Sequence, residues 1–253
     1  MVHFVGAGPG APDLITVRGA KLLGEADVVV WAGSLVNGEL LGLCKEGCEI
    51  HDSSRLTLEE TTAVLSEADR SGKVCVRLHT GDPCLFGAIR EQMEELDRLG
   101  VEYDVVPGVS SFCGAASAVK REYTVPGVSQ TVIISRMEGK TPVPRREGIA
   151  ELSRHGASMV LFLSSGMIRE LCGELLRGGA YTESTPCCVV YKATWADERI
   201  VEGTLSDIAD KAEEAGVRKT ALVLVGDFLG GSYGKSLLYD KSFSTEFRKA
   251  VEK

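Results

Sequence analysis

The sequence lacks the features that mark membrane and secreted proteins. No run approaches the roughly 18 consecutive apolar residues that a membrane-spanning helix needs. The N-terminus enters a short apolar strand directly, without the basic and long apolar regions of a secretion signal. The 253 residues are 44% hydrophobic and 25% charged, which is typical of a globular protein. We therefore expect a cytoplasmic protein with no membrane partner, built as one large domain or two ordinary ones.

Patterns for metal binding and disulfide scaffolds are also missing. The eight cysteines include no Cys-x-x-Cys pair and the four histidines show no ligand spacing, so we expect reduced thiols and no metal. Cys84 lies in a loop of interest, where a small packing residue is favoured over a reactive thiol. The net charge of −8 argues against a nucleic-acid partner, because such proteins usually carry a basic face.

No spacing supports nucleophilic catalysis. The chain has no Gly-x-Ser-x-Gly elbow, no paired His and Cys, and no clustered carboxylates apart from those on predicted exposed helix faces. Its loops are instead rich in Gly, Pro, Ser and Thr, which suits a cofactor that brings its own reactivity.

A glycine-rich turn at residues 6–16 resembles the turns that hold phosphate on backbone N–H groups. Pro9 removes one donor, and no Gly-Lys-Ser/Thr follows. The glycines also miss the Gly-x-Gly-x-x-Gly register. A dinucleotide site is therefore the less favoured interpretation.

Strands and helices alternate through the first half of the chain. Apolar runs predict strands at residues 2–5, 27–31, 48–51, 73–79 and 102–106. Between them, helical patterns cover residues 17–25, 57–72, 88–99 and 111–120. This alternation implies right-handed crossovers, and so a doubly wound α/β domain with a mostly parallel sheet.

The pattern breaks at residues 121–127, where we place a domain boundary, giving an N-terminal α/β domain at residues 1–120 and a C-terminal α/β domain at 121–253. Further strands are predicted at residues 131–135, 158–163, 186–191, 199–202 and 220–226, with helices at 145–155, 167–177 and 205–215.

Two strand ends in the first half are followed by loops of special composition. Gly81-Asp82-Pro83 follows one strand, and Pro107-Gly108-Val109-Ser110-Ser111 follows the next. The carboxyl ends of parallel strands share one edge, which is where open α/β sheets bind ligands. Gly81 permits close backbone approach and Pro83 stiffens the turn. The sequence therefore predicts a binding site at this edge, with the 80–85 turn at a helix N-terminus.

These residues resemble the tetrapyrrole methyltransferase family. The resemblance rests on Gly6-x-Gly-Pro-Gly, Asp27, Gly81-Asp82-Pro83 and the 107–111 stretch, in that order, and covers essentially the whole chain. Within the family, residues 32–36, 124–131 and 139–144 are similar to members that act on a corrin precursor. The resemblance implies S-adenosylmethionine-dependent methyl transfer to ring carbon 11 of precorrin-4 or cobalt-precorrin-4, in cobalamin synthesis. It also implies a homodimer of two-domain subunits, with the cofactor in the crevice between the domains.

The resemblance further implies particular contacts in this chain, while no catalytic residue is assigned. Cofactor contacts are expected at Pro9, Thr80, Gly81, Asp82, Leu85, Ser110, Ser111, Leu163, Ala193, Thr220 and Ala221. For Leu163 and Ala221, plain core packing is an equal alternative. A wide, polycarboxylated ring needs donors around a rim, and the candidates are Gly33, Ser34 and Arg136, with further charges at residues 140–146.

Two departures from the family pattern concern substrate contacts. Ala11 stands where the family usually has Asp, and Phe86 where it often has Tyr. Three alternatives remain open: methylation at another position of a tetrapyrrole, a cofactor-binding protein without turnover, and methylation of ribosomal RNA or a translation factor. The acidic charge disfavours the last of these.

Overall fold

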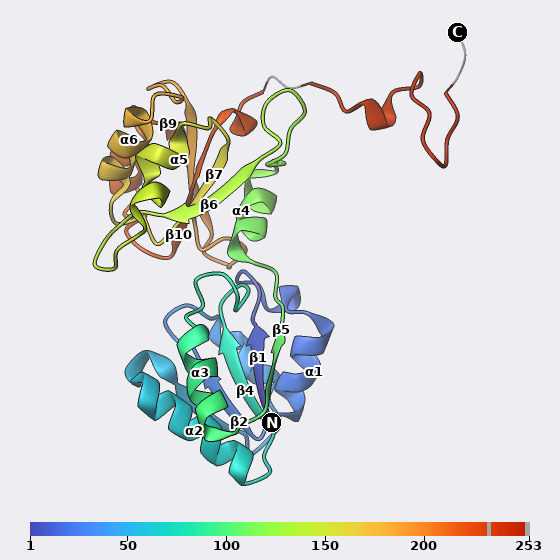
Figure 1. Cartoon of the computed structure of the whole chain (residues 1–253), viewed down its shortest axis with the longest axis vertical. Coiled ribbons are helices and arrows are strands. Elements are labelled where there is room, and N and C mark those ends of the chain that lie inside the picture. Colours follow the sequence, from blue (N-terminus) through green and yellow to red (C-terminus); the bar gives the residue numbers. More distant parts are fainter. Residues whose placement is uncertain (232–233, 251–253) are drawn as a thin grey trace. The chain divides into compact units, whose positions relative to one another are not determined.

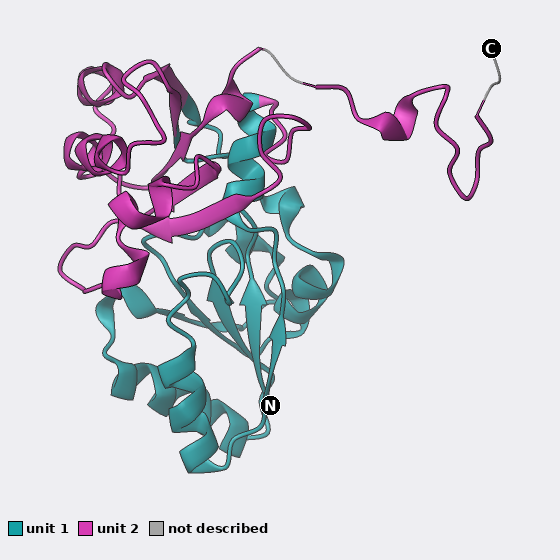
Figure 2. Cartoon of the chain, turned by 45° about the horizontal axis from the view of Figure 1, so that its top comes forward, with its two compact units in different colours: residues 1–119, 190–199 teal, residues 120–189, 200–253 magenta. Residues whose placement is uncertain are grey.

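The computed structural model describes residues 1–231 and 234–250. The chain forms two compact units, which Figure 2 colours separately. Unit 1 comprises Met1–Val119 with Val190–Arg199, and unit 2 comprises Lys120–Val189 with Ile200–Lys253. The domain boundary at 120/121 remains a prediction.

Unit 1 is built on a five-stranded sheet (Figure 1). Its strands are β1 (Val2–Gly6), β2 (Val28–Trp31), β3 (Glu49–Asp52), β4 (Cys75–His79) and β5 (Tyr103–Val106). The spatial order is β3-β2-β4-β1-β5, and all four neighbouring pairs run parallel. The predicted parallel sheet is therefore confirmed, and all five strands deliver their carboxyl ends to one edge.

Helices cover both faces of this sheet. Because successive strand residues face opposite ways, neighbouring residues of one strand join different cores. Val5 and Val29 join a core with Leu23 of α1 (Val17–Glu25), whereas Phe4 and Val30 join a second core with Leu65. That second core packs beneath α2 (Leu58–Arg70) and α3 (Arg90–Leu99). Each fully buried aliphatic side chain contributes about 1.5–3 kcal/mol. The unit is doubly wound, as the alternation predicted.

Local signals set most helix ends. Thr57 and Glu60 form the predicted capping box at the start of α2, and Gly100 ends α3 in the left-handed conformation. The predicted start of α3 at residue 88 is wrong, because Ala88 has a φ of 49° and the helix begins at Arg90. The fourth helix, α4 (Ser111–Val119), begins where the sequence placed it.

Unit 2 contains a second five-stranded sheet of order β6-β7-β10-β8-β9. Its strands are β6 (Val132–Arg136), β7 (Ser158–Phe162), β8 (Pro186–Tyr191), β9 (Arg199–Thr204) and β10 (Ala221–Val225). β6 runs parallel to β7 and β10 antiparallel to it, so the sheet is mixed. Its helices are α5 (Ile149–Ser153), α6 (Ile168–Arg177) and α7 (Ile208–Glu214).

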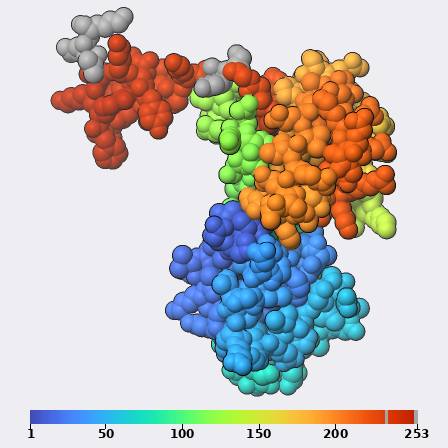
Figure 3. All heavy atoms as spheres, turned by 180° about the vertical axis from the view of Figure 1, so that it is seen from behind, coloured from blue at the N-terminus to red at the C-terminus, as the bar shows by residue number. Residues whose placement is uncertain are grey.

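Residues 234–250 contain only one short 3₁₀ turn, Leu237–Tyr239, and their side chains stand at the surface (Figure 3). Leu237, Tyr239 and Phe247 are exposed apolar side chains in this stretch. Within residues 1–231 and 234–250, no helix is long and apolar enough to cross a bilayer. The same residues contain no group of three or more His, Cys, Asp or Glu side chains that could hold a metal ion.

Candidate binding site at the carboxyl edge of the first sheet

Three glycines meet where β1, β4 and β5 end. A Cβ atom on Gly108 would lie 2.1 Å from the Gly81 carbonyl oxygen and 2.8 Å from the Gly6 Cα. A Cβ atom on Gly6 would lie 2.5 Å from the Gly108 Cα. Gly81 also has a φ of 59°, which favours glycine. We call Gly6, Gly81 and Gly108 the glycine junction; it brings both predicted loops into backbone contact.

The Asp82 carboxylate joins the same two loops. Oδ1 accepts the Cys84 N–H at 2.8 Å, and Oδ2 accepts the Gly108 N–H at 2.9 Å. Hydrogen bonds to a charged acceptor are the stronger kind, contributing about 1.5–3 kcal/mol each. The side chain that the sequence assigned to a ligand therefore also holds the loop after β4 against the loop after β5.

The helix that begins at this edge is α4. It starts at Ser111, directly after the buried Ser110, whereas α3 begins only at Arg90. The helix N-terminus expected at the 80–85 turn is thus supplied by the 107–111 loop. The N–H groups of a first helical turn have no partner inside the helix, and the helix dipole favours an anion there. This end of α4 suits a carboxylate.

The glycine-rich turn after β1 uses its backbone donors internally. The Ala7 N–H donates to the His79 carbonyl at 2.7 Å, and the Gly8 N–H donates to the Gly81 carbonyl at 3.3 Å. The Ala11 N–H donates to Thr194 Oγ1 at 3.0 Å. With Pro9 lacking a donor, little of this turn is available to phosphate. The geometry disfavours the dinucleotide interpretation.

The segment 190–199 belongs to unit 1 and packs on this turn. A Cβ on Gly10 would lie 2.0 Å from Trp195 Cδ1, so the indole ring lies directly against the Gly10 backbone. Thr194 has a φ of 70°, and its N–H donates to Glu198 Oε2 at 2.6 Å. This folding places the buried Ala193 in the same unit as Pro9. Neither Thr194 nor Trp195 belongs to a motif that could have been recognised in the sequence alone.

The structure distributes the predicted cofactor residues over both units. Those in unit 1 are Pro9, Thr80, Gly81, Asp82, Leu85, Ser110, Ser111 and Ala193, and those in unit 2 are Leu163, Thr220 and Ala221. Leu163 follows β7 and Ala221 opens the antiparallel β10, so they lie at the same end of neighbouring strands. Leu163 is 64% exposed with a φ of 52°, which contradicts its reading as a core residue.

Arg136, the predicted substrate contact in unit 2, organises its own loop. Nη1 donates to the carbonyls of Met137 and Thr141 at 3.1 Å each, and Nη2 donates to the Pro142 carbonyl at 2.7 Å. These bonds fix the loop after β6. Its contact with substrate stays a prediction.

Asp52 holds the other predicted rim loop, and sequence reasoning missed it. Its Oδ1 accepts the Gly33 N–H at 3.1 Å and the Ser54 N–H at 2.9 Å. A Cβ on Gly33 would lie 2.6 Å from that carboxylate. Backbone hydrogen bonds with Ser54 and Gly33 lower the pKa of Asp52, so the carboxylate is charged at neutral pH.

An Asp52→Ala substitution should free the 32–36 loop while leaving the cofactor edge intact. We expect KM for the methyl acceptor to rise about tenfold, about 1.4 kcal/mol, with unchanged affinity for S-adenosylhomocysteine. Steady-state kinetics and calorimetry on the same preparation measure both. Glu46→Ala, which removes an exposed carboxylate elsewhere in unit 1, is the control. Equal KM values for the two variants would contradict the assignment.

His79 is the buried side chain at the end of β4. It is 4% exposed and stacks on Phe4 with ring centroids 6.0 Å apart. Within the described residues its Nε2 has no hydrogen-bond partner. Burial, and then the nearby Arg77 charge, lower the pKa of His79 to about 3. The imidazole is therefore neutral in the folded protein.

This depressed pKa predicts an acid-labile fold. The unfolded chain takes up a proton near the ordinary histidine pKa of 6.5, whereas folded His79 does so only near 3. The stability that His79 contributes is therefore complete above pH 6.5 and is lost as the pH falls toward 3, by up to about 1.4 kcal/mol per pH unit. Urea unfolding at pH 7, 6, 5 and 4.5 measures this slope. His79→Phe should flatten it, and identical slopes in both proteins would exclude His79 as the cause.

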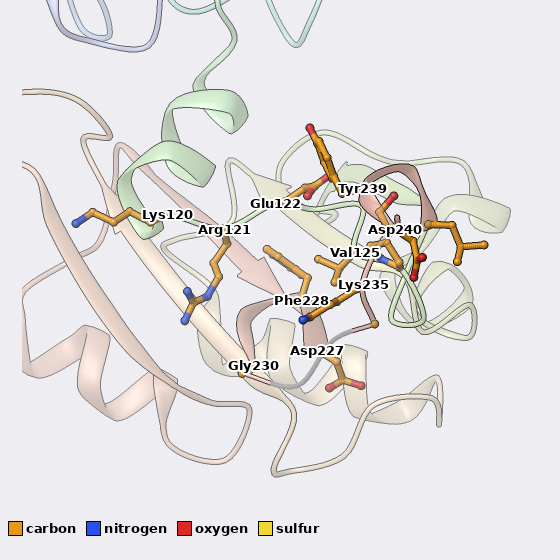
Figure 4. Close-up of a pocket in the computed structure, with 15 residues that line it drawn as sticks. Lys120, Arg121, Glu122, Val125, Asp227, Phe228, Gly230, Lys235, Tyr239 and Asp240 are labelled. Carbon is orange, nitrogen blue, oxygen red and sulfur yellow. The ribbon is translucent and has the colours of Figure 1, made fainter. Parts of the chain in front are cut away.

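Unit 2 also has a pocket of about 900 Å³ (Figure 4). Lys120, Arg121, Asp227, Phe228 and Tyr239 are among its lining residues, and none of the predicted cofactor or substrate residues lines it. Its walls combine cationic, acidic and apolar groups without a common chemistry. We assign it no role.

Comparison with known proteins gives a consistent answer. Residues 1–209 match the family model for tetrapyrrole (corrin/porphyrin) methylases. The chain is 50% identical over 253 residues to the cobalt-precorrin-4 C(11)-methyltransferase of Methanocaldococcus jannaschii, covering 100% of this chain and 97% of the relative. The X-ray structure of the cobalt precorrin-4 methyltransferase CbiF superposes with a TM-score of 0.88 at 46% identity, covering 91% and 96% of the two chains.

A further solved structure carries the demethylated cofactor. Uroporphyrin-III C-methyl transferase from Thermus thermophilus, complexed with S-adenosyl homocysteine, matches with a TM-score of 0.74 at 28% identity over 90% of this chain and 93% of that one. The α/β fold, the parallel sheet of unit 1 and the second sheet agree with these structures. The chain belongs to the tetrapyrrole (corrin/porphyrin) methylase family, and is a methyltransferase that uses S-adenosylmethionine.

Proposed function

We propose that this methyltransferase acts on ring carbon 11 of precorrin-4 or cobalt-precorrin-4, in cobalamin synthesis. Full-length similarity supports this substrate and position over those of other family members: the chain is 50% identical to a cobalt-precorrin-4 C(11)-methyltransferase, with 100% of this chain covered. The likeness to the uroporphyrin-III enzyme of Thermus thermophilus is lower, at 28% identity.

The cofactor is proposed to bind the carboxyl edge of the first sheet. The glycine junction packs the 80–85 turn closely against the start of α4, and this helix N-terminus at Ser111 suits the methionine carboxylate. Pro9, Thr80, Gly81, Asp82, Leu85, Ser110, Ser111 and Ala193 are the proposed contacts from unit 1. Leu163, Thr220 and Ala221 are proposed from unit 2, where the exposure of Leu163 is consistent with ligand contact.

The residues of this edge favour catalysis by alignment. S-adenosylmethionine, when bound, supplies a sulfonium methyl group that is already activated for transfer. The Asp82 carboxylate is held by two backbone N–H groups, and His79 is buried and neutral. Neither is arranged to act as a base. We infer that the chain accelerates transfer mainly by holding the acceptor carbon in line with the methyl group.

The acceptor would be recognised through its acid groups. Gly33 and Ser34 lie in the loop that Asp52 holds, and Arg136 begins a loop that leads to the exposed Lys140, Arg145 and Arg146. Guanidinium and ammonium groups pair well with acetate and propionate carboxylates. The 32–36 loop of unit 1 and the 136–146 loop of unit 2 are the proposed recognition elements.

The proposal is tested by determining which ring carbon of the product carries the transferred methyl group. The purified protein is incubated with S-adenosylmethionine carrying a ¹³C-methyl group and with corrin precursors, with and without cobalt, and the product is examined by NMR. Label at carbon 11 is the expected result. Label at carbon 17 or 20 means another member of the family, and no label on any tetrapyrrole supports a cofactor-binding protein without turnover. The two substrate forms, compared by kcat/KM, show whether cobalt is already present.

We also propose a cytoplasmic homodimer. All eight cysteines are free of disulfides, which fits a reducing compartment. Burial raises the pKa of Cys44 and Cys172 to about 11, that of Cys75 and Cys188 to about 12, and that of Cys187 well above its ordinary value. Dimerisation rests on the family resemblance. Light scattering of the full chain measures it, with a mass near twice 27.0 kDa expected.

A further inference from the structure

A buried arginine lies next to the binding edge without a carboxylate partner among the described residues. Arg77 of β4 is 6% exposed and donates only to neutral oxygens: Nε to Gln92 Oε1 at 2.9 Å, and Nη1 to the carbonyls of Val30 at 3.2 Å and Leu78 at 3.5 Å. Burying such a charge is costly. The role of Arg77 can therefore be inferred from the groups that accept its hydrogen bonds, of which the Gln92 side chain is the one that leads to the binding edge.

Gln92 connects Arg77 to the loop before α3 by hydrogen bonds. The Gln92 side chain is 6% exposed, accepts from Arg77 through Oε1 and donates through Nε2 to the Ala88 carbonyl at 2.8 Å. The Arg77 bond fixes which end of the amide is the donor, because guanidinium cannot accept. In this pair of hydrogen bonds Arg77 donates to Gln92, and Gln92 in turn donates to the Ala88 carbonyl.

The loop that receives this bond has a strained backbone. Phe86 and Ala88 have φ values of 55° and 49°, in the left-handed region that costs a non-glycine residue about 1–2 kcal/mol. Between them, a Cβ on Gly87 would lie 2.1 Å from the Pro83 carbonyl oxygen, so the loop folds tightly on itself. Such conformations persist only where the surrounding structure holds them.

The loop is fixed at both ends. Asp82 holds its start through Cys84 and Gly108, and Gln92 holds its end through Ala88. We propose that Arg77 and Gln92 are positioning residues that keep residues 83–88 in the conformation that binds the methyl donor, with Gln92 acting through the Ala88 carbonyl and Arg77 acting through Gln92. The inference rests on the proposed cofactor site, since Leu85 lies within this loop.

The decisive variant is Gln92→Glu. A glutamate still accepts from Arg77, as an ion pair, but it cannot donate to the Ala88 carbonyl. The substitution therefore removes only the hydrogen bond to the Ala88 carbonyl, and Arg77 keeps its acceptor at position 92. We expect Kd for S-adenosylhomocysteine and KM for S-adenosylmethionine to rise about tenfold, with kcat at saturation changed less than threefold. Hydrogen exchange at residues 84–88 should accelerate while β1 and β4 stay protected.

Glu91→Gln is the matched control, because it makes the reverse exchange at an exposed position of the same helix. It should leave Kd and KM unchanged. A folded Gln92→Glu protein with wild-type Kd and KM overturns the inference. If Gln92→Glu does not fold, Gln92→Met, which removes both bonds without a charge, is measured in the same way. Failure of the wild-type protein to bind S-adenosylhomocysteine would instead refute the proposed cofactor site.

Discussion

A Gly108→Ala variant is expected to lose affinity for S-adenosylhomocysteine by at least about 100-fold, about 2.7 kcal/mol. The added methyl group would lie 2.1 Å from the Gly81 carbonyl oxygen and 2.8 Å from the Gly6 Cα. These neighbours are backbone atoms, so the strand ends of β1, β4 and β5 must separate. The 80–85 turn and the start of α4 then move apart. Calorimetry measures the affinity, and thermal unfolding shows whether the fold survives.

Gly42→Ala is the control for this substitution. Gly42 is exposed and has no heavy atom within 4 Å of its added Cβ, so neither affinity nor stability should fall. A folded Gly108→Ala protein that binds S-adenosylhomocysteine as tightly as the Gly42→Ala protein would show that the glycine junction does not shape the cofactor site.

Asp82→Ala should weaken cofactor binding by about 10–100-fold, and Asp82→Asn should have a smaller effect. Alanine leaves the N–H groups of Cys84 and Gly108 without their acceptor, whereas asparagine retains one oxygen for one of them. Since the carboxylate is proposed to hold loops, kcat at saturating cofactor should change less than threefold in Asp82→Asn.

The two variants also test for a missed catalytic base. Kd by calorimetry and kcat by the labelled-methyl assay are measured together for both. If Asp82→Asn abolishes turnover while the affinities for cofactor and acceptor stay intact, then Asp82 takes part in the chemistry and alignment alone is not sufficient.

Most strands were predictable because they are short apolar runs that end at a turn signal, although β3 (Glu49–Asp52) and β9 (Arg199–Thr204) mix polar and apolar residues. All ten strands of the described chain appear where the pattern indicated, within a few residues. The start of α3 was not predictable, because a left-handed Ala88 depends on a side chain from the next helical turn. No local propensity signals that conformation in an alanine.

The site was predictable only where it consists of local loop chemistry. Gly81-Asp82-Pro83 and the 107–111 stretch are visible in the sequence, and parallel strands bring them together. Asp52 and Gly33, or Thr194 and Ala11, meet through tertiary structure between residues far apart in the chain. Their residue types have no periodicity, so a single sequence contains no signal that pairs them.

The glycine junction also limits how an enzyme of this design can diversify. Its contacts are between backbone atoms, so no side-chain exchange at Gly6, Gly81 or Gly108 can tune the site in small steps. Most residues of the loops at 32–36 and 137–146 are instead at least partly exposed, and the side chains of Asp52 and Arg136 hold these loops through backbone groups. We therefore expect enzymes of this design that accept different tetrapyrrole rings to differ in those loops and to share the same three glycines.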